Sequence, residues 1–392
     1  MPIPAPLIES LSTPCVIIEK TRMEANLSRM QAKADGQGVV LRPHTKTHKC
    51  VKIARQQIDL GARGITVAKV GEAEIYVAAG LDDVRLAYTV VGQEKHERLM
   101  ALMDGARISF CVDTPEGARA ASEYYAAHGR RAEVLIEVDS AYGRCGVRWD
   151  QPDSLAFARY VNSLPGLRLT GILTHHGTSY NGPHEDETKE AALRRYSAEE
   201  RDRMLAFAGR LAELPGIERS SFEISIGSTP SMRHFENRTV DGFSITEIRP
   251  GNYVFHDLTQ VGLESADLKD CALTVLATVI SKHRDPDGQE RLFLDAGKKV
   301  LTSDGAYDHS GYGCLLYSAR LMEPLPHAQI TGLSEEHGWV KIKGGATLNV
   351  GDRVRLVPNH ACVVVNTQDR LFVVDGEKVV DTWTVDAQGR VR

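Results

Sequence analysis

The chain has 392 residues, a formal net charge of -5 and a charged fraction of 25%. This length predicts one large domain and a smaller one, because single hydrophobic cores rarely grow beyond about 250–300 residues. Charges of both signs are interspersed, so no basic surface for nucleic acid is expected, and no apolar run is long enough to span a bilayer. These features exclude nucleic-acid and membrane partners and favour a small-molecule ligand.

Residues 1–10 lack the basic segment and apolar core of a secretory signal. We therefore expect a cytoplasmic protein. The seven cysteines are scattered and none lies in a CxxC pair, so neither a disulfide framework nor a four-thiolate zinc site is expected. Most of these cysteines should be small buried thiols.

Apolar runs of strand character alternate with amphipathic helical stretches over the first part of the chain. Alternation of this kind predicts βα units and a parallel sheet. Eight such strands fit a TIM (β/α)8 barrel, which we expect to span residues 20–262. The predicted strands are Val39–Arg42, Gly64–Val67, Val84–Ala87, Ile108–Val112, Glu133–Val138, Leu169–Leu173, Ser221–Ile226 and Ile245–Ile248.

After about residue 265 the sequence becomes rich in strands separated by turn signals such as Asp285–Gly288. We expect a C-terminal antiparallel β-domain over residues 263–392. Residues 1–19 are expected to join it, because the apolar run Cys15–Ile18 can pair with its strands. The predicted strands are Leu273–Ile280, Arg291–Asp295, Val340–Lys343, Arg353–Val357, Cys362–Asn366, Leu371–Asp375 and Val379–Thr384.

Lys46 follows the first predicted strand by a few residues, within Arg42-Pro43-His44-Thr45-Lys46. Catalytic groups of a TIM barrel lie where strands end at its carboxyl face, so a lysine here is a candidate for imine formation. A solvated basic loop is the alternative interpretation, because most lysines are surface residues.

Two loops rich in small residues follow the seventh and eighth predicted strands, and TIM barrels commonly bind a phosphate at these positions. Gly227-Ser228-Thr229 forms the first and Gly251-Asn252-Tyr253 the second. Ordinary turns would have similar sequences.

Polar side chains also follow the fifth and sixth predicted strands. Arg144 and His175 there could hydrogen-bond or stack on a cofactor ring, or could be structural hydrogen bonders.

A third group of candidates lies in the predicted β-domain. In an extended segment residues two apart point to the same face, so His360 and Cys362 could together bind a borderline-soft ion such as zinc. Two ligands make half a site, and a core cysteine beside a capping histidine is the alternative. His337, within Glu335-Glu336-His337-Gly338, is a candidate for substrate contact in what would otherwise be a solvated loop.

Taken in chain order, these motifs resemble those of fold-type III pyridoxal phosphate enzymes, in the D-serine dehydratase and D-threonine aldolase family. The resemblance covers nearly the whole chain and implies an alanine-racemase-like barrel with a β-domain, often arranged as a homodimer. The matching segments are Thr13-Pro14, Arg42–Lys46, Gly143–Val147, His175–Tyr180, Gly227–Pro230, Gly251–Phe255, Asp295–Gly297, Glu335–Gly338 and Pro358–Cys362.

The resemblance also implies roles for the candidate residues. Lys46 would hold pyridoxal 5'-phosphate as a Schiff base, and the two small-residue loops would hold its phosphate. The metal would keep open positions for substrate and water. The residues assigned to the cofactor are Lys46, His44, Arg144, His175, Tyr180, Gly227, Ser228, Thr229, Gly251, Asn252 and Tyr253, and those assigned to the metal are His360 and Cys362.

The implied reaction is elimination of water from D-serine or a related D-3-hydroxy amino acid, giving a 2-oxo acid and ammonia. Cys362 favours this dehydratase and Zn²⁺, because the aldolases of the family typically have aspartate there, and a carboxylate suits Mn²⁺ or Mg²⁺. An aldolase that forms glycine and an aldehyde from D-threonine or 3-hydroxy-D-aspartate is the alternative. A racemase would leave the metal pair unused, and non-enzymatic pyridoxal phosphate carriers of this fold resemble the barrel alone.

Overall fold

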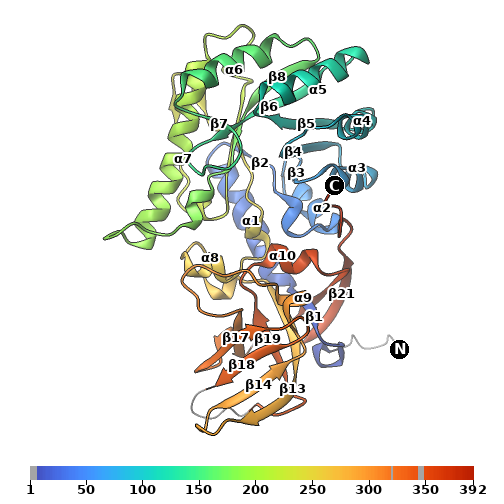
Figure 1. The fold of residues 1–392 in the computed structure, drawn as a ribbon, viewed down its shortest axis with the longest axis vertical. Helices are drawn as coiled ribbons and strands as arrows, with labels where there is room; N and C mark the ends of the chain where they lie inside the picture. Colours follow the sequence, from blue (N-terminus) through green and yellow to red (C-terminus); the bar gives the residue numbers. More distant parts are fainter. Residues whose placement is uncertain (1–6, 319–320, 343–347) are drawn as a thin grey trace. The chain divides into compact units, whose positions relative to one another are not determined.

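The computed structural model describes residues 7–318, 321–342 and 348–392 (Figure 1). It divides into two compact units. The unit that we call the α/β unit comprises Arg29–Lys46, Val51–Gly251 and Gly389–Arg392, and the β unit comprises Met1–Ser28, Thr47–Cys50 and Asn252–Gln388. Among the described residues, no helix combines the length and the apolarity that crossing a membrane requires. The predicted domain boundary after residue 262 stays a prediction.

The α/β unit is built on a parallel sheet in the order β2-β12-β9-β8-β6-β5-β4-β3, with β7 beside β6. All eight predicted strands are therefore present, and the predicted α/β class is confirmed. Closure of the sheet into a barrel stays a prediction. The strands are β2 (Val40–Leu41), β3 (Ile65–Val67), β4 (Asp83–Thr89), β5 (Arg107–Val112), β6 (Ala132–Asp139), β7 (Val147–Arg148), β8 (Leu167–Thr174), β9 (Glu223–Ile226) and β12 (Glu247–Ile248).

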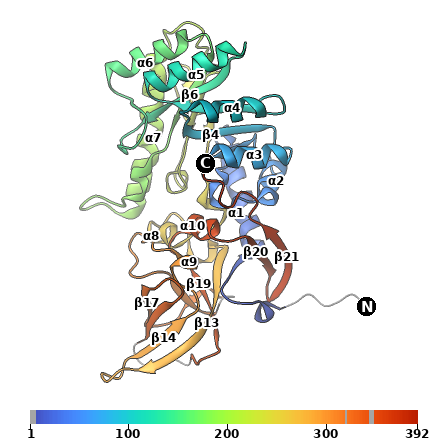
Figure 2. The same cartoon turned by 45° about the vertical axis from the view of Figure 1, so that its right-hand side comes forward.

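Helices connect successive strands, and Figures 1 and 2 show α3 to α6 following one another around the sheet. Thr114 starts α5 by accepting a hydrogen bond from the N–H of Gly117, and Thr188 starts α7 by accepting one from Ala191. The helices are α1 (Lys20–Gly36), whose residues are shared between the units, α2 (Val51–Asp59), α3 (Val70–Ala78), α4 (Gln93–Leu102), α5 (Pro115–Ala127), α6 (Pro152–Ser163) and α7 (Lys189–Leu211).

One face of the parallel sheet carries a network of buried and half-buried charges, most of which lie near the amino ends of the strands, whereas Arg42 follows β2. The Arg42 guanidinium lies 2.6 Å from carboxylate oxygens of both Asp83 and Glu247, and Arg85 lies 2.6 Å from Glu247. Arg85 also pairs with Glu223. We call these residues, with Arg107 and Glu133, which continue the network, the charge layer.

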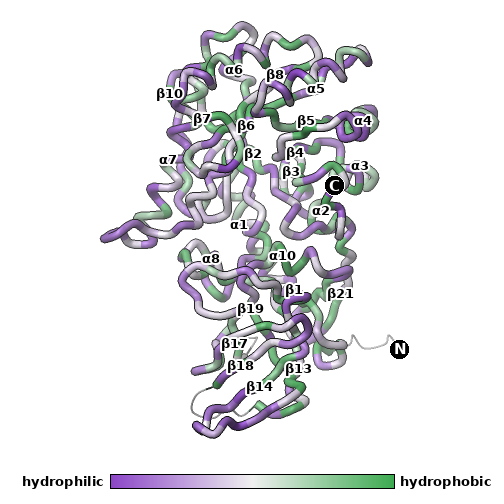
Figure 3. Tube along the Cα trace, in the orientation of Figure 1, coloured by the Kyte–Doolittle hydropathy of each residue, from purple (hydrophilic) through white to green (hydrophobic). Residues whose placement is uncertain are grey.

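An apolar cluster, which we call the apolar layer, lies further along the strands: two residues after Arg85 in β4 and Glu133 in β6, four residues after Arg107 in β5, and near the carboxyl end of β8. It consists of Cys111, Leu135 and Leu173, with Ala87 packed against them. Residues two apart in a strand face the same way, so the next layer begins at the carboxyl ends of the strands. Figure 3 shows β5 and β6 as largely hydrophobic, in keeping with their burial. The charge and apolar layers fill the amino-terminal part of this face and leave its carboxyl end for a site.

The β unit is a mostly antiparallel sheet in the order β16-β15-β19-β13-β1-β20-β21, to which β14, β18 and β17 are added through β13. β1 pairs with β13 and with β20, so the prediction that Cys15–Ile18 joins this domain is confirmed. The strands are β1 (Cys15–Glu19), β13 (Leu273–Arg284), β14 (Glu290–Leu294), β15 (Cys314–Ser318), β16 (Glu323–Pro324), β17 (Ala328–Leu333), β18 (Gly338–Ile342), β19 (Arg353–Val357), β20 (Arg370–Asp375) and β21 (Lys378–Thr384).

The predicted strand Cys362–Asn366 is wrong, because these residues belong to the short helix α10 (Ala361–Asn366). The buried Asp257 carboxylate accepts a hydrogen bond from the N–H of Ala361 at 2.9 Å, which satisfies a donor of the first helical turn. Burial of Val364 and Val365 then outweighs the strand preference of valine. Lys343, predicted to end another strand, lies outside the described residues.

Candidate functional site

Lys46 lies in a 3-10 turn, η2 (Thr45–Thr47), after β2. The N–H of His44 donates to the carbonyl of Pro250 at 3.0 Å, and the N–H of Lys46 lies 3.4 Å from Nδ1 of His44. Residues 41–45 and 47–50 are buried, whereas Lys46 is exposed. The structure therefore presents the Lys46 amine from a fixed backbone while leaving it accessible to a ligand.

The predicted phosphate loop Gly227-Ser228-Thr229 follows β9. Gly227 has a φ of 128°, and a Cβ there would lie 2.9 Å from the backbone nitrogen of Arg249, so only glycine fits without strain. The Ser228 hydroxyl lies 2.8 Å from that of Ser179 in the loop after β8. Because β12 pairs with β9, Gly251 follows the neighbouring strand. The two predicted phosphate loops thus start at the same edge of the sheet.

Asn252 and Tyr253 stand in η5 (Asn252–Val254) at the start of a segment of the β unit. The amide nitrogen of Asn252 donates to Asp257 at 2.6 Å and lies 3.7 Å from Sγ of Cys362. Its Oδ1 is buried and has no hydrogen-bond partner among the described residues. The Asn252 side chain therefore offers an acceptor, and a phosphate bound at this loop would depend on other donors. Tyr253 is buried.

Three rings gather after β6 and β8. The His175 ring centroid lies 6.0 Å from that of Tyr142, edge on, and 6.5 Å from that of Tyr180. Tyr142 lies against Gly177, where any Cβ would overlap its ring. The structure thus brings the predicted His175 and Tyr180 together with Tyr142, an aromatic residue that was not among the predicted site residues.

Arg144 is carried by the loop 139–146, which is held by carboxylates. Its Nη2 lies 3.6 Å from Oε1 of Glu137, and its guanidinium is 5.8 Å from the ring centroid of Tyr142. Asp139 and Asp113 accept N–H groups of the same loop at 2.9 to 3.0 Å. These contacts support a defined position for Arg144.

The local electrostatics keep the His175 imidazole neutral. Burial, together with the positive charges of Lys46, Arg144 and Arg249, lowers the pKa of His175 well below its usual value. Because the positive charge of Lys46 acts on the His175 imidazole, these two side chains interact electrostatically. A neutral imidazole can hydrogen-bond to a ligand without adding a positive charge.

The predicted metal pair is in direct contact. His360 precedes α10 in an extended conformation, Cys362 is its second residue, and their side chains hydrogen-bond to each other. Burial alone would lower the pKa of His360, but Cys362 outweighs it and raises this pKa to about 10. Burial likewise opposes ionisation of Cys362, yet His360 lowers the thiol pKa. The pair therefore favours the thiolate form that binds metals.

Neighbouring groups orient both members of the pair. Nδ1 of His360 lies 2.7 Å from Oδ2 of Asp304, and the Thr47 hydroxyl lies 3.1 Å from Sγ of Cys362. The Asn359 amide donates to the carbonyls of Asp304 and Gly311 at 2.9 and 2.8 Å, which ties the Asp304 loop to this segment. A carboxylate on one imidazole nitrogen leaves the other for a metal.

This donor set fits a divalent cation. An imidazole and a thiolate that already share a proton can bind one soft or borderline ion in its place. Within residues 7–318, 321–342 and 348–392, no group of three or more His, Cys, Asp or Glu side chains is arranged to hold a metal. A cation on His360 and Cys362 would therefore need further ligands from water or substrate, as an open catalytic site does.

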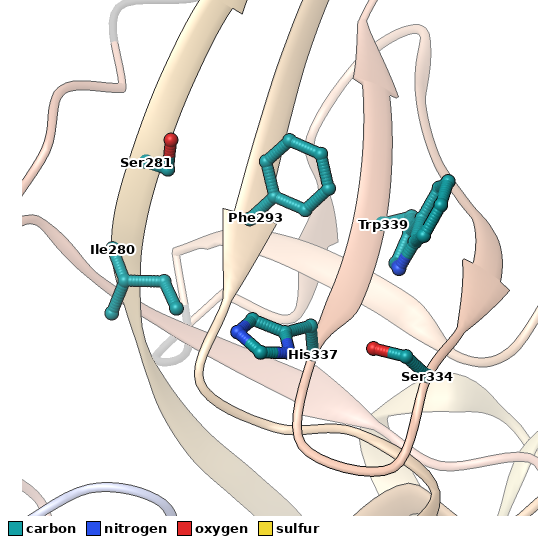
Figure 4. A pocket seen from close by; sticks show the side chains of 6 residues that line it. All are labelled: Ile280, Ser281, Phe293, Ser334, His337 and Trp339. Carbon is teal, nitrogen blue, oxygen red and sulfur yellow. The ribbon is translucent and has the colours of Figure 1, made fainter.

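His337 lies in the loop between β17 and β18 of the β unit. It lines a cavity of about 350 Å³ on the β unit, shown in Figure 4. Its imidazole lies beside the rings of Phe293 and Trp339, whose centroids are 5.6 Å apart. The remaining lining residues are Ile280, Ser281 and Ser334. A substrate role for His337 stays a prediction, and these neighbours give it a largely apolar setting.

Several residues of the site escaped the sequence analysis. Tyr142 could have been found because it precedes Arg144 in the same loop. The others are four carboxylates and one arginine, whose partners are brought close only by the fold. They are Glu137, Glu200, Arg249, Asp257 and Asp304.

Comparison with protein families gives two matches. Residues 18–258 match the family described as alanine racemase, N-terminal domain. Residues 272–374 match the family described as putative serine dehydratase domain. The two matches cover the sheet of the α/β unit and most strands of the β unit.

Individual relatives match over nearly the whole chain. D-threonine aldolase from Arthrobacter sp. is 35% identical over 391 residues, covering 98% of this chain and 95% of that protein. D-threo-3-hydroxyaspartate dehydratase from Delftia sp. (strain HT23) is 35% identical over 392 residues, covering 95% and 97%. A solved cysteine-to-alanine mutant of D-threo-3-hydroxyaspartate dehydratase, described as being in the metal-free form, has a TM-score of 0.86 and 33% identity, covering 97% of this chain and 98% of that one.

Proposed function

The chain belongs to the alanine racemase N-terminal domain family, and on this premise we propose that it is a pyridoxal phosphate- and metal-dependent lyase. Its reaction would be the elimination of water from a D-3-hydroxy amino acid, giving a 2-oxo acid and ammonia. The resemblance to the D-serine dehydratase and D-threonine aldolase family is confirmed by the relatives. The observation that carries the proposal is the hydrogen-bonded His360–Cys362 pair, which a racemase or a simple cofactor carrier would not need.

The proposal includes a closed barrel around the cofactor. The N–H of Thr66 donates to the carbonyl of Pro43 at 2.8 Å, and an isolated parallel bridge joins His44 to Thr66. These contacts connect the segment that follows β2 to β3 itself, and β2 and β3 are the two outer strands of the sheet order. They support closure beside Lys46.

Each proposed role follows from the chemistry of the residue. Bound pyridoxal phosphate supplies an electron sink for negative charge at the α-carbon, and a bound divalent cation supplies a Lewis acid for the hydroxyl leaving group. Lys46 offers the exposed amine that holds the cofactor and, once released by the substrate, a base for the α-proton. Neutral His175 and the carboxylate-held Arg144 would orient the cofactor ring.

We rank the dehydratase above the aldolase because of Cys362, since the aldolases of the resembled family typically have aspartate at this position. A thiolate at Cys362 suits Zn²⁺, whereas a carboxylate would suit Mn²⁺ or Mg²⁺. Because an aldolase and a dehydratase are equally similar to this chain, an aldolase giving glycine and an aldehyde is the second candidate.

Product analysis tests the proposal. The purified protein, loaded with pyridoxal phosphate and Zn²⁺, would be offered D-serine, D-threonine and D-threo-3-hydroxyaspartate. We expect a 2-oxo acid and ammonia in equal amounts from at least one of them. Glycine with an aldehyde would establish the aldolase instead. Recovery of every substrate unchanged, or only its inverted enantiomer, would refute a lyase.

A further inference from the structure

A buried carboxylate lies behind the predicted phosphate loop. Glu200 is on α7, and its side chain is fully buried. One of its oxygens accepts the N–H of Gly227 at 2.9 Å, and the other accepts the Ser231 hydroxyl at 2.7 Å. The N–H of His176 is a further donor to it. Burial raises the pKa of Glu200, and these hydrogen bonds oppose that rise.

The hydrogen bonds continue from Glu200 through the loop. Because the Ser231 hydroxyl donates to Glu200, its oxygen is left to accept, and it receives the N–H of Ser228 at 3.3 Å. The Ser228 hydroxyl lies 3.1 Å from Ser231 and 2.8 Å from Ser179, so a chain of hydroxyls ends on the carboxylate. This chain sets the conformation of Ser228 and joins the loops after β8 and β9.

The network also decides which groups can face a ligand. The N–H groups of Gly227 and Ser228 both point into the protein, toward Glu200 and Ser231, and are not offered to a phosphate in this conformation. Gly227 cannot be exchanged for a larger residue that would hold the loop by packing, because a Cβ would approach the backbone of Arg249. The loop therefore depends on Glu200 for its shape.

We propose that Glu200 is a positioning residue for a phosphate monoester: it holds the Gly227–Thr229 loop in the conformation that binds the phosphate group of pyridoxal phosphate. The inference rests on the proposed function, since that function supplies the phosphate-bearing ligand. It goes further because it distinguishes binding of the phosphate group from attachment of the cofactor at Lys46. Glu200 would affect phosphate binding by holding the loop, without touching the ligand itself.

The test compares two ligands that differ only in the phosphate. Full-length protein stripped of cofactor would be titrated with pyridoxal phosphate and, separately, with pyridoxal, and binding would be followed by the absorbance of the Schiff base. Glu200→Gln preserves size but turns one acceptor into a donor that faces the N–H of Gly227. We expect this variant to bind pyridoxal phosphate at least about 10-fold more weakly, with pyridoxal binding unchanged.

A matched control and a second variant complete the design. Glu190→Gln changes an exposed glutamate on the same helix, paired with Arg194, and should leave both affinities unchanged. Ser231→Ala keeps the Glu200–Gly227 contact but breaks the hydroxyl chain, so it should weaken pyridoxal phosphate binding selectively even if Glu200→Gln fails to fold.

The outcomes separate this inference from the function on which it rests. Unchanged binding of both ligands in both variants, or an equal loss for both ligands, would overturn the positioning role and leave the proposed lyase standing. If the unmodified protein formed no Schiff base with pyridoxal phosphate, the proposed function would fail and the inference with it.

Discussion

Lys46 is the residue proposed to form a Schiff base with the cofactor, a bond that only a primary amine can form. Lys46→Ala should abolish the visible absorbance of the Schiff base and all turnover, because no other group can replace the amine. Spectra before and after borohydride reduction, with mass analysis of the reduced peptide, would check this. Lys95→Ala, on α4 of the same unit, is the control and should keep both properties. A reducible Schiff base retained on another lysine would contradict the assignment.

Asp304 would extend the proposed metal site by one residue. Its carboxylate fixes His360 through a 2.7 Å contact, and loss of such partners typically lowers metal affinity about 10–100-fold. Asp304→Asn should therefore weaken Zn²⁺ binding by this range, as measured by competition with a chromophoric chelator. Asp287→Asn, in the exposed turn before β14, should have no effect. Equal zinc affinity in the two variants would refute a role for Asp304.

The sequence indicated some of these residues and could not indicate others. Lys46, His360 and Cys362 were candidates from their residue types and positions, and the resemblance of the surrounding motifs to a known family gave them their predicted roles. Asp304 lies 56 positions from His360, and Glu200 lies 27 from Gly227. Carboxylates at such distances are indistinguishable from surface residues in a single sequence. Their roles depend on how the elements are brought together.

At the level of elements, the loop after β9 combines a required glycine with a hydrogen-bond network. Gly227→Ala should destabilise the fold by about 1–3 kcal/mol, because its φ of 128° is strained for any side chain and its Cβ would approach Arg249. Urea unfolding would measure the loss. Gly36→Ala at the end of α1, where nothing lies within 4 Å of the new Cβ, should be neutral or slightly stabilising. Equal stability of the two variants would show that the loop relaxes freely.

Elements with regular apolar patterns were predictable, whereas the strand predicted at Cys362–Asn366 is wrong because of a contact between residues far apart in the sequence. The strands of the parallel sheet all occur close to their predicted positions because burial on both faces gives continuous apolar runs. The valine-rich segment of α10 has the same appearance. Its helix depends on Asp257, 104 residues away, accepting the N–H of Ala361. No local pattern reveals that partner.

At the level of the whole molecule, acid should lower the stability of the fold by protonating a carboxylate of the charge layer. Arg85 and Arg42 hold the pKa of buried Glu247 at about 2, below its usual 4.5, despite the opposing effect of burial. The stability from this ionised carboxylate is complete above about pH 4.5 and is lost as the pH falls toward 2.

Glu247→Gln should accordingly cost roughly 3–5 kcal/mol at pH 7, because two buried guanidinium groups lose a charged partner. The difference from the unmodified protein should shrink as the pH falls from 4.5 toward 2. Urea unfolding at several pH values would measure both effects. Glu190→Gln is the surface control, and a difference that stayed constant with pH would contradict the prediction.

The arrangement of the chain into two units was only partly predictable. The two-part organisation and the joining of Cys15–Ile18 to the β-rich part followed from composition and apolar runs. Residues 47–50 and 389–392, however, each group with a unit other than that of their nearest neighbours in the chain. A four-residue segment is too short to show a hydrophobic pattern in the sequence, so the unit to which it belongs becomes clear only in the structure.

The charge layer has a consequence for protein engineering. Its side chains share their partners, so a single exchange there leaves another buried charge uncompensated, whatever the substrate. The loops at the opposite ends of the same strands are held by contacts outside the charge layer, such as those of Glu200 and Asp139. Libraries that aim at a new substrate range should therefore vary these loops, changing the loops after β8 and β9 together because Ser179 and Ser228 join them, and should keep the charge layer unchanged as the scaffold on which every variant folds.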